Sequence, residues 1–203
     1  MGARPRWTER CEDAMPEETA YAPAAFYDDL AASYDRIYPD WEASSRQQGE
    51  ALQAVIAAQL GPGPHRVLDC AVGIGTQLLG LAANGYRLAG SDISTGAVGR
   101  AQAECRRRGP SRPGRGRHAR AALRRRGLDV VVCADNSLPH LLTAEDVTRA
   151  LGELCRVARP GGLVVVSTRD YDQGRQDRPP TTPLSLSHGS DGSTTVTFQL
   201  WEW

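Results

Sequence analysis

The sequence of 203 residues contains no lysine, so its 24 basic side chains are all arginine. A phosphate-binding loop of the Walker type needs a lysine after its second glycine and is therefore excluded. No apolar run approaches the roughly 18 to 20 residues of a membrane-spanning helix, and no segment has the charged start and apolar stretch of a secretory signal. These absences favour a cytoplasmic protein with no membrane partner. The arginine-only composition, with much alanine and glycine, indicates a GC-rich bacterial genome.

Cysteine is scarce and scattered. The five cysteines are an odd number and show no Cys-x-x-Cys spacing. Neither a disulfide framework nor a zinc site is therefore predicted, and we expect no bound metal. A reducing cytoplasm fits this pattern. The length suits one domain that can bury a real core.

The most informative segment is 66–76. A short apolar run meets Asp69, then come Gly73-x-Gly75 and an apolar helical stretch. This order predicts a strand, a glycine turn and a helix. Glycine lets the backbone approach a ligand closely, and the start of a helix offers free N–H groups and a positive dipole end. The segment therefore predicts a site for a small, partly anionic ligand.

A second predicted strand ends in Asp92, 17 residues after Gly75. A carboxylate there suits the two ribose hydroxyls of a nucleoside. A dinucleotide fingerprint is incomplete, because Leu78 stands where its third glycine would be. Asp-x-x-x-Gly-x-Gly with this downstream acid resembles the cofactor site of class I S-adenosylmethionine-dependent methyltransferases, which usually carry glycine where Ala71 stands. The alternative is a tight turn in another α/β protein.

Strands and helices alternate along the chain, which predicts an α/β fold. With the resemblance, we expect a doubly wound, mostly parallel sheet, a Rossmann-like class I methyltransferase fold that is incomplete at the C-terminal end. Helices are predicted at 24–38, 42–60, from the glycine turn to about 83, 95–107 and 144–157, and strands at the apolar run 67–68 before Asp69, and at 87–92, 128–134, 163–168 and 194–203. A turn is expected at 160–162 and a polar loop at 172–192. In domain terms, we expect a disordered tail at 1–22 and a methyltransferase domain at 23–203 with a helical lid at 23–60 and a truncated C-terminus.

An arginine-rich stretch interrupts this pattern. Ten of the 24 arginines lie in residues 106–126, which contain no acid, and a third strand expected there is missing. We predict an irregular loop at 106–127. One interpretation is a compensated frameshift, which would leave a degenerate or truncated inactive product. The rival is a nucleic-acid-binding module, but the stretch has no aromatic residue for base stacking, so we do not favour a nucleic-acid partner.

A second cluster follows the apolar strand at 128–134. Asn136-Ser137-x-x-His140 and Arg169-x-Tyr171 resemble the glycine/sarcosine N-methyltransferase branch of the class I family. The resemblance implies that an arginine holds the carboxylate of an amino acid, and Arg169 is the match. A guanidinium can bind a carboxylate through two parallel hydrogen bonds.

The resemblance also implies the roles of individual residues. The methionine part of S-adenosylmethionine would contact Asp69, Ala71, Gly73 and Gly75. Asp92 would hold the ribose, with Ile93 beside it. Ala134 and His140 would lie along the cofactor, Asn136 and Arg169 would face the substrate, and a closing N-terminal segment would supply Tyr34, Trp41 and Arg46. Each has a plainer reading: Arg169 as a surface ion-pair partner, His140 as a helix cap, Asn136 as a turn residue, and Tyr34 and Trp41 as packing residues.

The implied function is methyl transfer from S-adenosylmethionine to the amine of a small amino acid, glycine or sarcosine-like. The sequence offers no committed general base, so no catalytic residue is assigned, although Tyr171 is a candidate. Alternatives are a class I methyltransferase acting on another small metabolite, or an inactive product. The expected partner is a small-molecule amine, and a homo-oligomer stays open.

Overall fold

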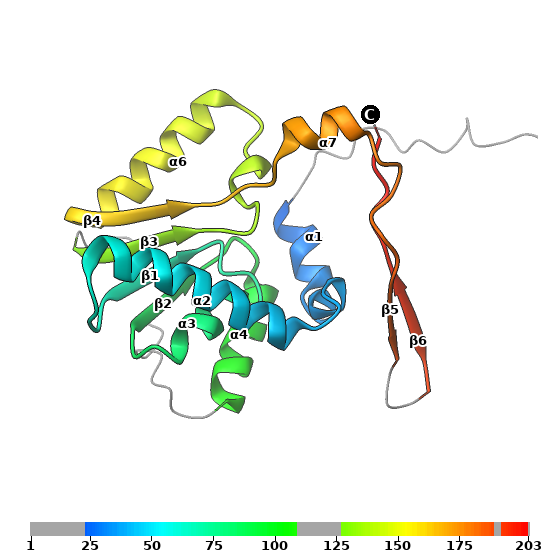
Figure 1. Ribbon diagram of the computed structural model, residues 1–203, viewed down its shortest axis with the longest axis horizontal. Helices are drawn as coiled ribbons and strands as arrows, with labels where there is room; N and C mark the ends of the chain where they lie inside the picture. The colour runs from blue at the N-terminus through cyan, green and yellow to red at the C-terminus, as the bar shows by residue number, and fades with distance from the viewer. Residues whose placement is uncertain (1–22, 109–126, 189–191, 203) are drawn as a thin grey trace, which may run out of the picture.

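The computed structural model describes residues 23–108, 127–188 and 192–202. They form a four-stranded parallel sheet of order β2-β1-β3-β4 with helices on both faces, and a separate two-stranded antiparallel hairpin, β5-β6 (Figure 1). The strands are β1 (Arg66–Cys70), β2 (Arg87–Ser91), β3 (Leu128–Cys133), β4 (Ala158–Val166), β5 (Ser185–His188) and β6 (Thr194–Thr197). The helices are α1 (Pro23–Leu30), α2 (Trp41–Leu60), α3 (Thr76–Ala82), α4 (Thr95–Arg107), α6 (Ala144–Val157) and α7 (Tyr171–Asp177), with short 3-10 helices η1 (Tyr34–Ile37) and η2 (Leu138–His140).

The sheet is buried because its central strands are apolar on both faces. In β1, Val67 and Leu68 are both fully buried and point to opposite sides, as successive strand residues do. One core joins Val67 to α2 and α3, and the other joins Leu68 to α6 across β3. The predicted doubly wound α/β arrangement is confirmed, and the carboxyl ends of the parallel strands meet at one edge of the sheet.

Helices α2 and α3 pack very closely. A Cβ atom added to Gly49 would overlap the backbone of Gly80, and one added to Gly80 would overlap the carbonyl oxygen of Ser45. The buried Ser45 hydroxyl donates to the carbonyl oxygen of Thr76 at 2.6 Å. Helix α2 is therefore fixed behind the first residue of α3, directly after the glycine turn.

The N-terminal helix predicted at 24–38 is broken. Helix α1 ends at Leu30, a turn is closed by the Ser33 amide donating to the Leu30 carbonyl at 2.9 Å, and η1 follows. The break changes which aromatic side chains face inward, and Phe26 is 55% exposed. Helix α2 begins at Trp41 with Asp40 as its N-cap, close to the predicted start at 42.

The turn predicted at 160–162 is a bulge inside strand β4, which begins at Ala158 and runs to Val166. Leu128 pairs with Ala158 but Val130 pairs with Leu163, so residues 159–162 of β4 lie opposite one residue of β3, and Gly161 has φ +69°. Proline has no N–H to donate, and β4 is the outer strand of the described sheet, so Pro160 interrupts no ladder between two strands. A bulge at the edge accommodates what the sequence pattern marks as a turn.

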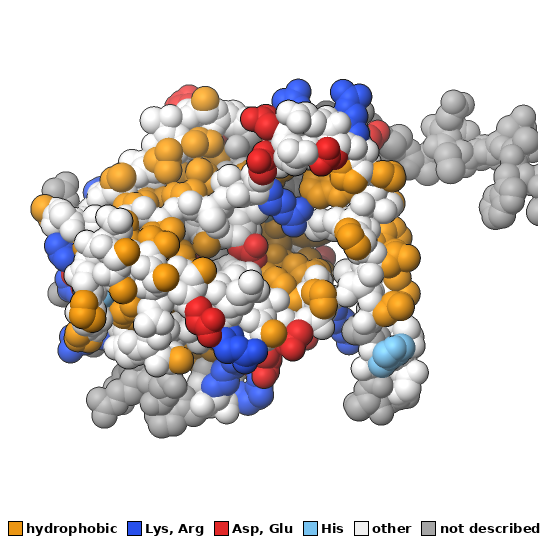
Figure 2. Space-filling model, in the orientation of Figure 1, with side chains coloured by type: hydrophobic (Ala, Val, Ile, Leu, Met, Phe, Trp, Pro, Cys, Tyr) orange, Lys and Arg blue, Asp and Glu red, His pale blue; other side chains and the backbone are white. Residues whose placement is uncertain are grey.

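The C-terminal prediction is wrong in two respects. The segment 172–192 is not a polar loop throughout, since it contains α7 and β5. The strand predicted at 194–203 is shorter, and β6 pairs with β5 rather than with the main sheet. Figure 2 shows hydrophobic side chains along this hairpin arm, at the right of the view; Leu186 is 63% exposed and Val196 50%.

The predicted tail at 1–22 and the missing third strand lie outside the described residues, as does most of the arginine-rich stretch. Its first members are described, and Arg106 and Arg107 form the last turn of α4 rather than a loop. None of the described helices is long and apolar enough to cross a membrane.

Candidate functional site

A cavity of about 530 Å³ opens at the carboxyl ends of β1, β2 and β3. This is the edge at which open α/β sheets bind ligands. Helix α1 and η1 form its opposite wall. The lining residues are Pro23, Tyr27, Ala31, Tyr34, Cys70, Ala71, Gly73, Ile74, Ser91, Asp92, Ile93, Ala97, Asp135, Ser137, His140 and Leu141.

Asp92 is held in the cavity wall by backbone amides. Gly73 N donates to its Oδ2 at 2.8 Å, and Ser94 N donates to its Oδ1 at 2.9 Å. Each carboxylate oxygen can accept a second hydrogen bond, because an ionised carboxylate has about four acceptor positions. The side chain is therefore fixed in position and still able to receive two hydroxyl groups.

The turn after β1 requires left-handed backbone. Gly73 has φ +52° and Gly75 has φ +98°, but Ala71 also has φ +68°. This conformation costs an L-residue about 1–2 kcal/mol and costs glycine almost nothing, which explains why glycine is usual at this position in the resembled family. The amides of Ala71 and Val72 both donate to the Ser91 carbonyl, at 2.8 and 2.9 Å, and so join the turn to β2.

Asp69 is completely buried beneath the turn. Among the described residues neither of its carboxylate oxygens has a hydrogen-bond partner. Burial, and secondly the negative charge of Asp92, raise the pKa of Asp69 to about 7. An orphaned acid of this kind is destabilising unless it stays protonated or a cation approaches.

The carboxyl end of β3 carries two further residues in left-handed backbone, Asp135 at φ +57° and Asn136 at φ +67°. Asp135 lines the cavity, and its Oδ2 accepts a hydrogen bond from the Tyr38 hydroxyl at 2.7 Å. Strained backbone of this kind is concentrated at binding and catalytic sites. Burial above all raises the pKa of Tyr34 and of Tyr38, so both phenols stay neutral.

Asn136 and Arg169 lie beside the cavity rather than in its wall. The Asn136 amide nitrogen donates to the Tyr171 hydroxyl at 2.7 Å, and its Oδ1 accepts from the Arg169 backbone amide at 3.2 Å. The exposed Arg169 guanidinium donates to Gln199 Oε1 at 3.2 Å and lies 5.6 Å from the ring centre of Trp201. The residues after β3 and β4 thus meet at one point, where two residues that follow β6 contact Arg169.

His140 and Tyr27 face each other across the cavity. The Tyr27 hydroxyl lies 2.8 Å from His140 Nε2, and the two rings meet edge to face at 5.5 Å. Sequence reasoning missed Tyr27. The spacing of Tyr27, Ala31 and Tyr34, at positions i, i+4 and i+7, is the signal that could have found it, because all three line the cavity.

The predicted site residues therefore divide into two groups. The cavity wall contains Tyr34, Ala71, Gly73, Asp92, Ile93 and His140. Outside it lie Asp69, Gly75, Ala134, Asn136, Arg169, Trp41 and Arg46. Trp41 packs in a core cluster with Ile74 and Leu79, and its Nε1 donates to Thr76 Oγ1 at 2.9 Å. Arg46 is exposed on α2. In the described ranges no three metal-ligating side chains come together.

Residues 67–162 match the family described as methyltransferase domain. The solved structure of DesVI from Streptomyces venezuelae aligns with a TM-score of 0.60 at 19% identity, over 89% of this chain and 70% of that one, which establishes the fold. The chain has a class I methyltransferase fold. S-adenosylmethionine is the cofactor of this domain class.

Two curated relatives show how the methyltransferase domain relates to longer proteins. A glycine/sarcosine N-methyltransferase of Parasynechococcus marenigrum is 27% identical over 162 residues, or 77% of this chain and 55% of that protein. A demethylmenaquinone methyltransferase of Thermobifida fusca is 35% identical over 143 residues, or 70% of this chain and 59% of that protein. The chain thus spans little more than half the length of these relatives.

The residues present fit S-adenosylmethionine. Asp92 is preset to receive two hydroxyls, and Gly73 leaves open space where a Cβ would project. Asp69 lies outside the cavity wall, buried beneath the turn, and takes no part in this fit. The fit rests on the two features at Asp92 and Gly73, independently of the sequence comparisons.

Proposed function

We propose that this protein transfers a methyl group from S-adenosylmethionine to the amine of a small amino acid of the glycine or sarcosine type. The observation that carries the proposal is the Asp92 carboxylate, oriented by two backbone amides in the wall of a 530 Å³ cavity. The curated glycine/sarcosine N-methyltransferase at 27% identity supports the choice of acceptor.

On the cofactor side, the roles follow from position. Asp92 would accept hydrogen bonds from the ribose hydroxyls, and Ile93, 67% exposed beside it, would cover the base. The turn at Ala71 and Gly73 would take the methionine part along its backbone, above Asp69. Tyr27, Tyr34 and His140 would close the cavity from the other side. The bound sulfonium supplies an already activated methyl group, so the protein mainly has to orient the acceptor.

On the acceptor side, two opposite charges suit an amino acid. Arg169 would hold the carboxylate. Its positive charge lowers the pKa of Tyr34, whereas the negative charges of Asp135 and Asp92 raise it, so charges of both signs lie near this part of the cavity. Asp135 would lie near the amine. The amine would release a proton to solvent before it attacks, so no committed base is needed. Its lone pair would then form the bond to the methyl carbon as the carbon–sulfur bond of the sulfonium breaks and leaves a neutral thioether, and a preoriented carboxylate would stabilise the positive charge that the nitrogen gains.

A second candidate acceptor is a larger metabolite without a carboxylate. The 35% identical relative, named a demethylmenaquinone methyltransferase, supports this alternative. Arg169 discriminates between the two candidates, because an acceptor without a carboxylate gives its guanidinium no partner.

The test is calorimetric binding of S-adenosylmethionine to the wild type, Asp92→Ala and the control Asp29→Ala, whose side chain is exposed on α1 and outside the cavity. Hydrogen bonds to a charged group contribute about 1.5–3 kcal/mol, so Asp92→Ala should weaken binding by roughly 10- to 150-fold while Asp29→Ala leaves it unchanged. Equal affinity in a folded Asp92→Ala protein would overturn the cofactor assignment. Turnover of glycine or sarcosine, compared with an amine that lacks a carboxylate, then tests the acceptor.

A further inference from the structure

Helix α1, which forms one wall of the cavity, is attached to α4 at the N-terminal end of α4. Asp28 Oδ1 accepts hydrogen bonds from Ser94 Oγ at 2.6 Å and from Gly96 N at 2.8 Å. Both bonds favour the ionised carboxylate, and the hydrogen bond from Ser94 is the first cause of the lowered pKa of Asp28. A negative charge at a helix N-terminus is also favourable.

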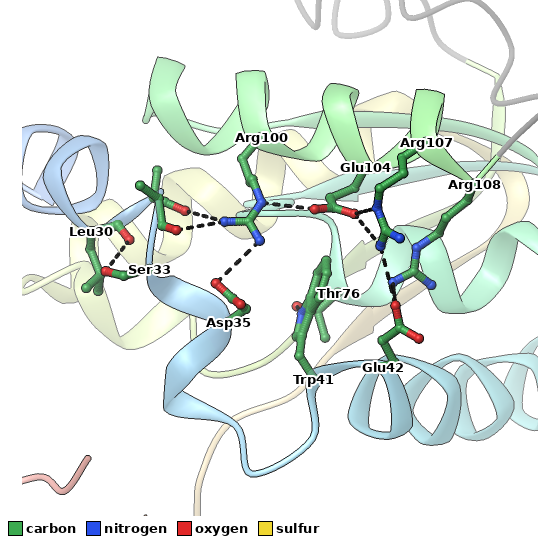
Figure 3. A network of polar contacts seen from close by, with 12 residues as sticks. Leu30, Ser33, Asp35, Trp41, Glu42, Thr76, Arg100, Glu104, Arg107 and Arg108 are labelled. Atoms are coloured by element: carbon green, nitrogen blue, oxygen red, sulfur yellow. Dashed lines mark hydrogen bonds and ion pairs between the residues drawn. The ribbon is translucent and has the colours of Figure 1, made fainter. Parts of the chain in front are cut away.

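A second attachment lies further along α4. The Arg100 guanidinium donates to the Ala32 carbonyl at 2.9 Å and pairs with Asp35 at 3.3 Å, while Glu104 fixes its other side at 3.1 Å. Figure 3 shows Arg100 reaching from α4 towards the turn between α1 and η1. The segment 23–37 is thus held on α4 at two points.

The first attachment continues directly to the cofactor residues. The Ser94 hydroxyl donates to Asp28 Oδ1, and the backbone amide of the same residue donates to Asp92 Oδ1 at 2.9 Å. Asp92 Oδ2 in turn accepts from Gly73 N at 2.8 Å. A continuous hydrogen-bonded chain therefore runs from the wall helix through Ser94 to the proposed ribose carboxylate and the glycine turn. The second attachment, at Arg100, does not reach these residues.

We propose that Asp28 is a positioning residue that couples the docking of α1 to Asp92, so that α1 closes over S-adenosylmethionine and slows its release. The inference rests on the proposed function, because it needs Asp92 to hold the cofactor. It adds that a residue outside the cavity wall determines how long the cofactor stays. The coupling is reciprocal, so a bound cofactor must also stabilise the docked position of α1.

Two glycines of α4 provide a matched test that alters no charged group. A Cβ on Gly96 would lie 3.2 Å from the Asp28 carbonyl oxygen and from its Oδ1, a tight contact that requires Asp28 to move by a few tenths of an ångström. A Cβ on Gly99 would meet nothing within 4 Å. Both glycine-to-alanine changes favour the helix by about the same amount. Only Gly96→Ala therefore disturbs the docking of α1.

The experiment measures S-adenosylmethionine dissociation rates by stopped flow, with the free energy of unfolding as a separate readout. We expect Gly96→Ala and Asp28→Ala to raise the dissociation rate about three- to tenfold, Gly99→Ala to leave it unchanged, and Asp28→Asn, which keeps an acceptor oxygen, to lie between wild type and Asp28→Ala. The free energy of unfolding should be similar in Gly96→Ala and Gly99→Ala, so that faster release from Gly96→Ala is not the result of partial unfolding. Equal dissociation rates for Gly96→Ala and Gly99→Ala would overturn the proposal.

Hydrogen exchange of the wild type and of Asp28→Ala provides the reciprocal readout. S-adenosylhomocysteine should slow exchange at residues 23–37, and that protection should be lost in Asp28→Ala even where the ligand still binds. Protection that is absent in the wild type, or unchanged in Asp28→Ala, would count against the coupling. If the wild type binds neither compound, the proposed function fails; if it binds normally and only these differences are missing, the inference alone fails.

Discussion

The two sides of the cavity are built differently. On the β1 and β2 side, the key carboxylate of Asp92 is held by backbone amides, and Asp69 is buried beneath a turn fixed to β2. On the β3 and β4 side, Asp135, Asn136 and Arg169 are held mainly by other side chains, among them Tyr38, Tyr171 and Gln199. Backbone contacts fix the geometry of the first side without a ligand. The geometry of the second side depends on side chains from segments that are distant in sequence.

This difference matches what each side would recognise. A cofactor that is the same in every member of a family needs a fixed site, and backbone amides provide one that side-chain changes do not alter. An acceptor that varies among relatives needs an adaptable site, and side chains contributed by a hairpin arm provide that. Four substitutions test this comparison.

The largest effect is expected for Asp69, on the cofactor side. Its pKa is raised from 3.8 to about 7 by burial, so the protonated native state is favoured at low pH, and this contribution is lost as pH rises through 7. Between pH 5 and pH 7 the loss is about 2 kcal/mol, because the slope of 1.36 kcal/mol per unit flattens as the pH reaches the folded-state pKa. Asp69→Asn, which stays neutral, should lack this loss. Urea denaturation of both proteins at pH 5 and pH 7 measures it, and parallel pH dependence in the two would show that Asp69 is not buried as described.

The acceptor side should respond to Arg169→Ala in its substrate kinetics alone. An exposed guanidinium that binds a carboxylate contributes modestly, so KM for a carboxylated amine should rise about tenfold while cofactor affinity changes less than threefold. Arg175→Ala, an exposed arginine on α7, is the matched control. An equal rise in KM for an amine lacking a carboxylate would assign Arg169 another role.

Backbone strain on the cofactor side predicts a gain in stability. Ala71→Gly removes the cost of φ +68° and should raise the free energy of unfolding by about 1 kcal/mol after the extra flexibility of the unfolded chain is counted. The same change in the interior of α6, Ala150→Gly, should lower it by about 1 kcal/mol. Urea denaturation of the two variants measures the expected gain in stability for Ala71→Gly and the expected loss for Ala150→Gly. A loss of stability in Ala71→Gly would refute the argument from strain.

The smallest effect on stability is expected in the hairpin arm. Leu186 is 63% exposed on β5, so Leu186→Thr keeps a strand-forming residue and should change the unfolding free energy by less than about 0.5 kcal/mol. Sedimentation velocity should show less self-association in the variant if the exposed arm associates with a second copy. An unchanged sedimentation profile at high concentration would argue against a role for Leu186 in association.

Local signals predicted the cofactor side well. The strand, glycine turn and Asp92 all depend on residues within 27 positions of each other, and their spacing alone brings them to one edge of the sheet. Helix α7 also had a readable signal that was overlooked: Asp170 caps it by accepting from Gln173 N at 3.0 Å, and Asp-x-x-Gln is a capping pattern.

The acceptor side was harder to predict because its contacts are distant in sequence. Gln199 meets Arg169 across 30 residues and Tyr38 meets Asp135 across 97, and no local pattern encodes either pairing. Tyr27 was missed for another reason. The spacing of Phe26, Leu30 and Tyr34 predicts one inward face, whereas Tyr27, Ala31 and Tyr34 line the cavity and Phe26 is 55% exposed. The glycines and proline at 160–162 indicate a turn, but not that it lies as a bulge within an edge strand.

The close packing of Gly49 on Gly80 has a consequence for any survey of mutational tolerance. Neither glycine lines the cavity, yet alanine at either position would force α2 and α3 apart and shift Thr76, the residue that follows the glycine turn. Both positions should therefore score as intolerant in a deep mutational scan, alongside Asp92. Intolerance at these two positions would report the separation of two helices, and only a binding assay on folded protein would distinguish it from a role in recognising the ligand.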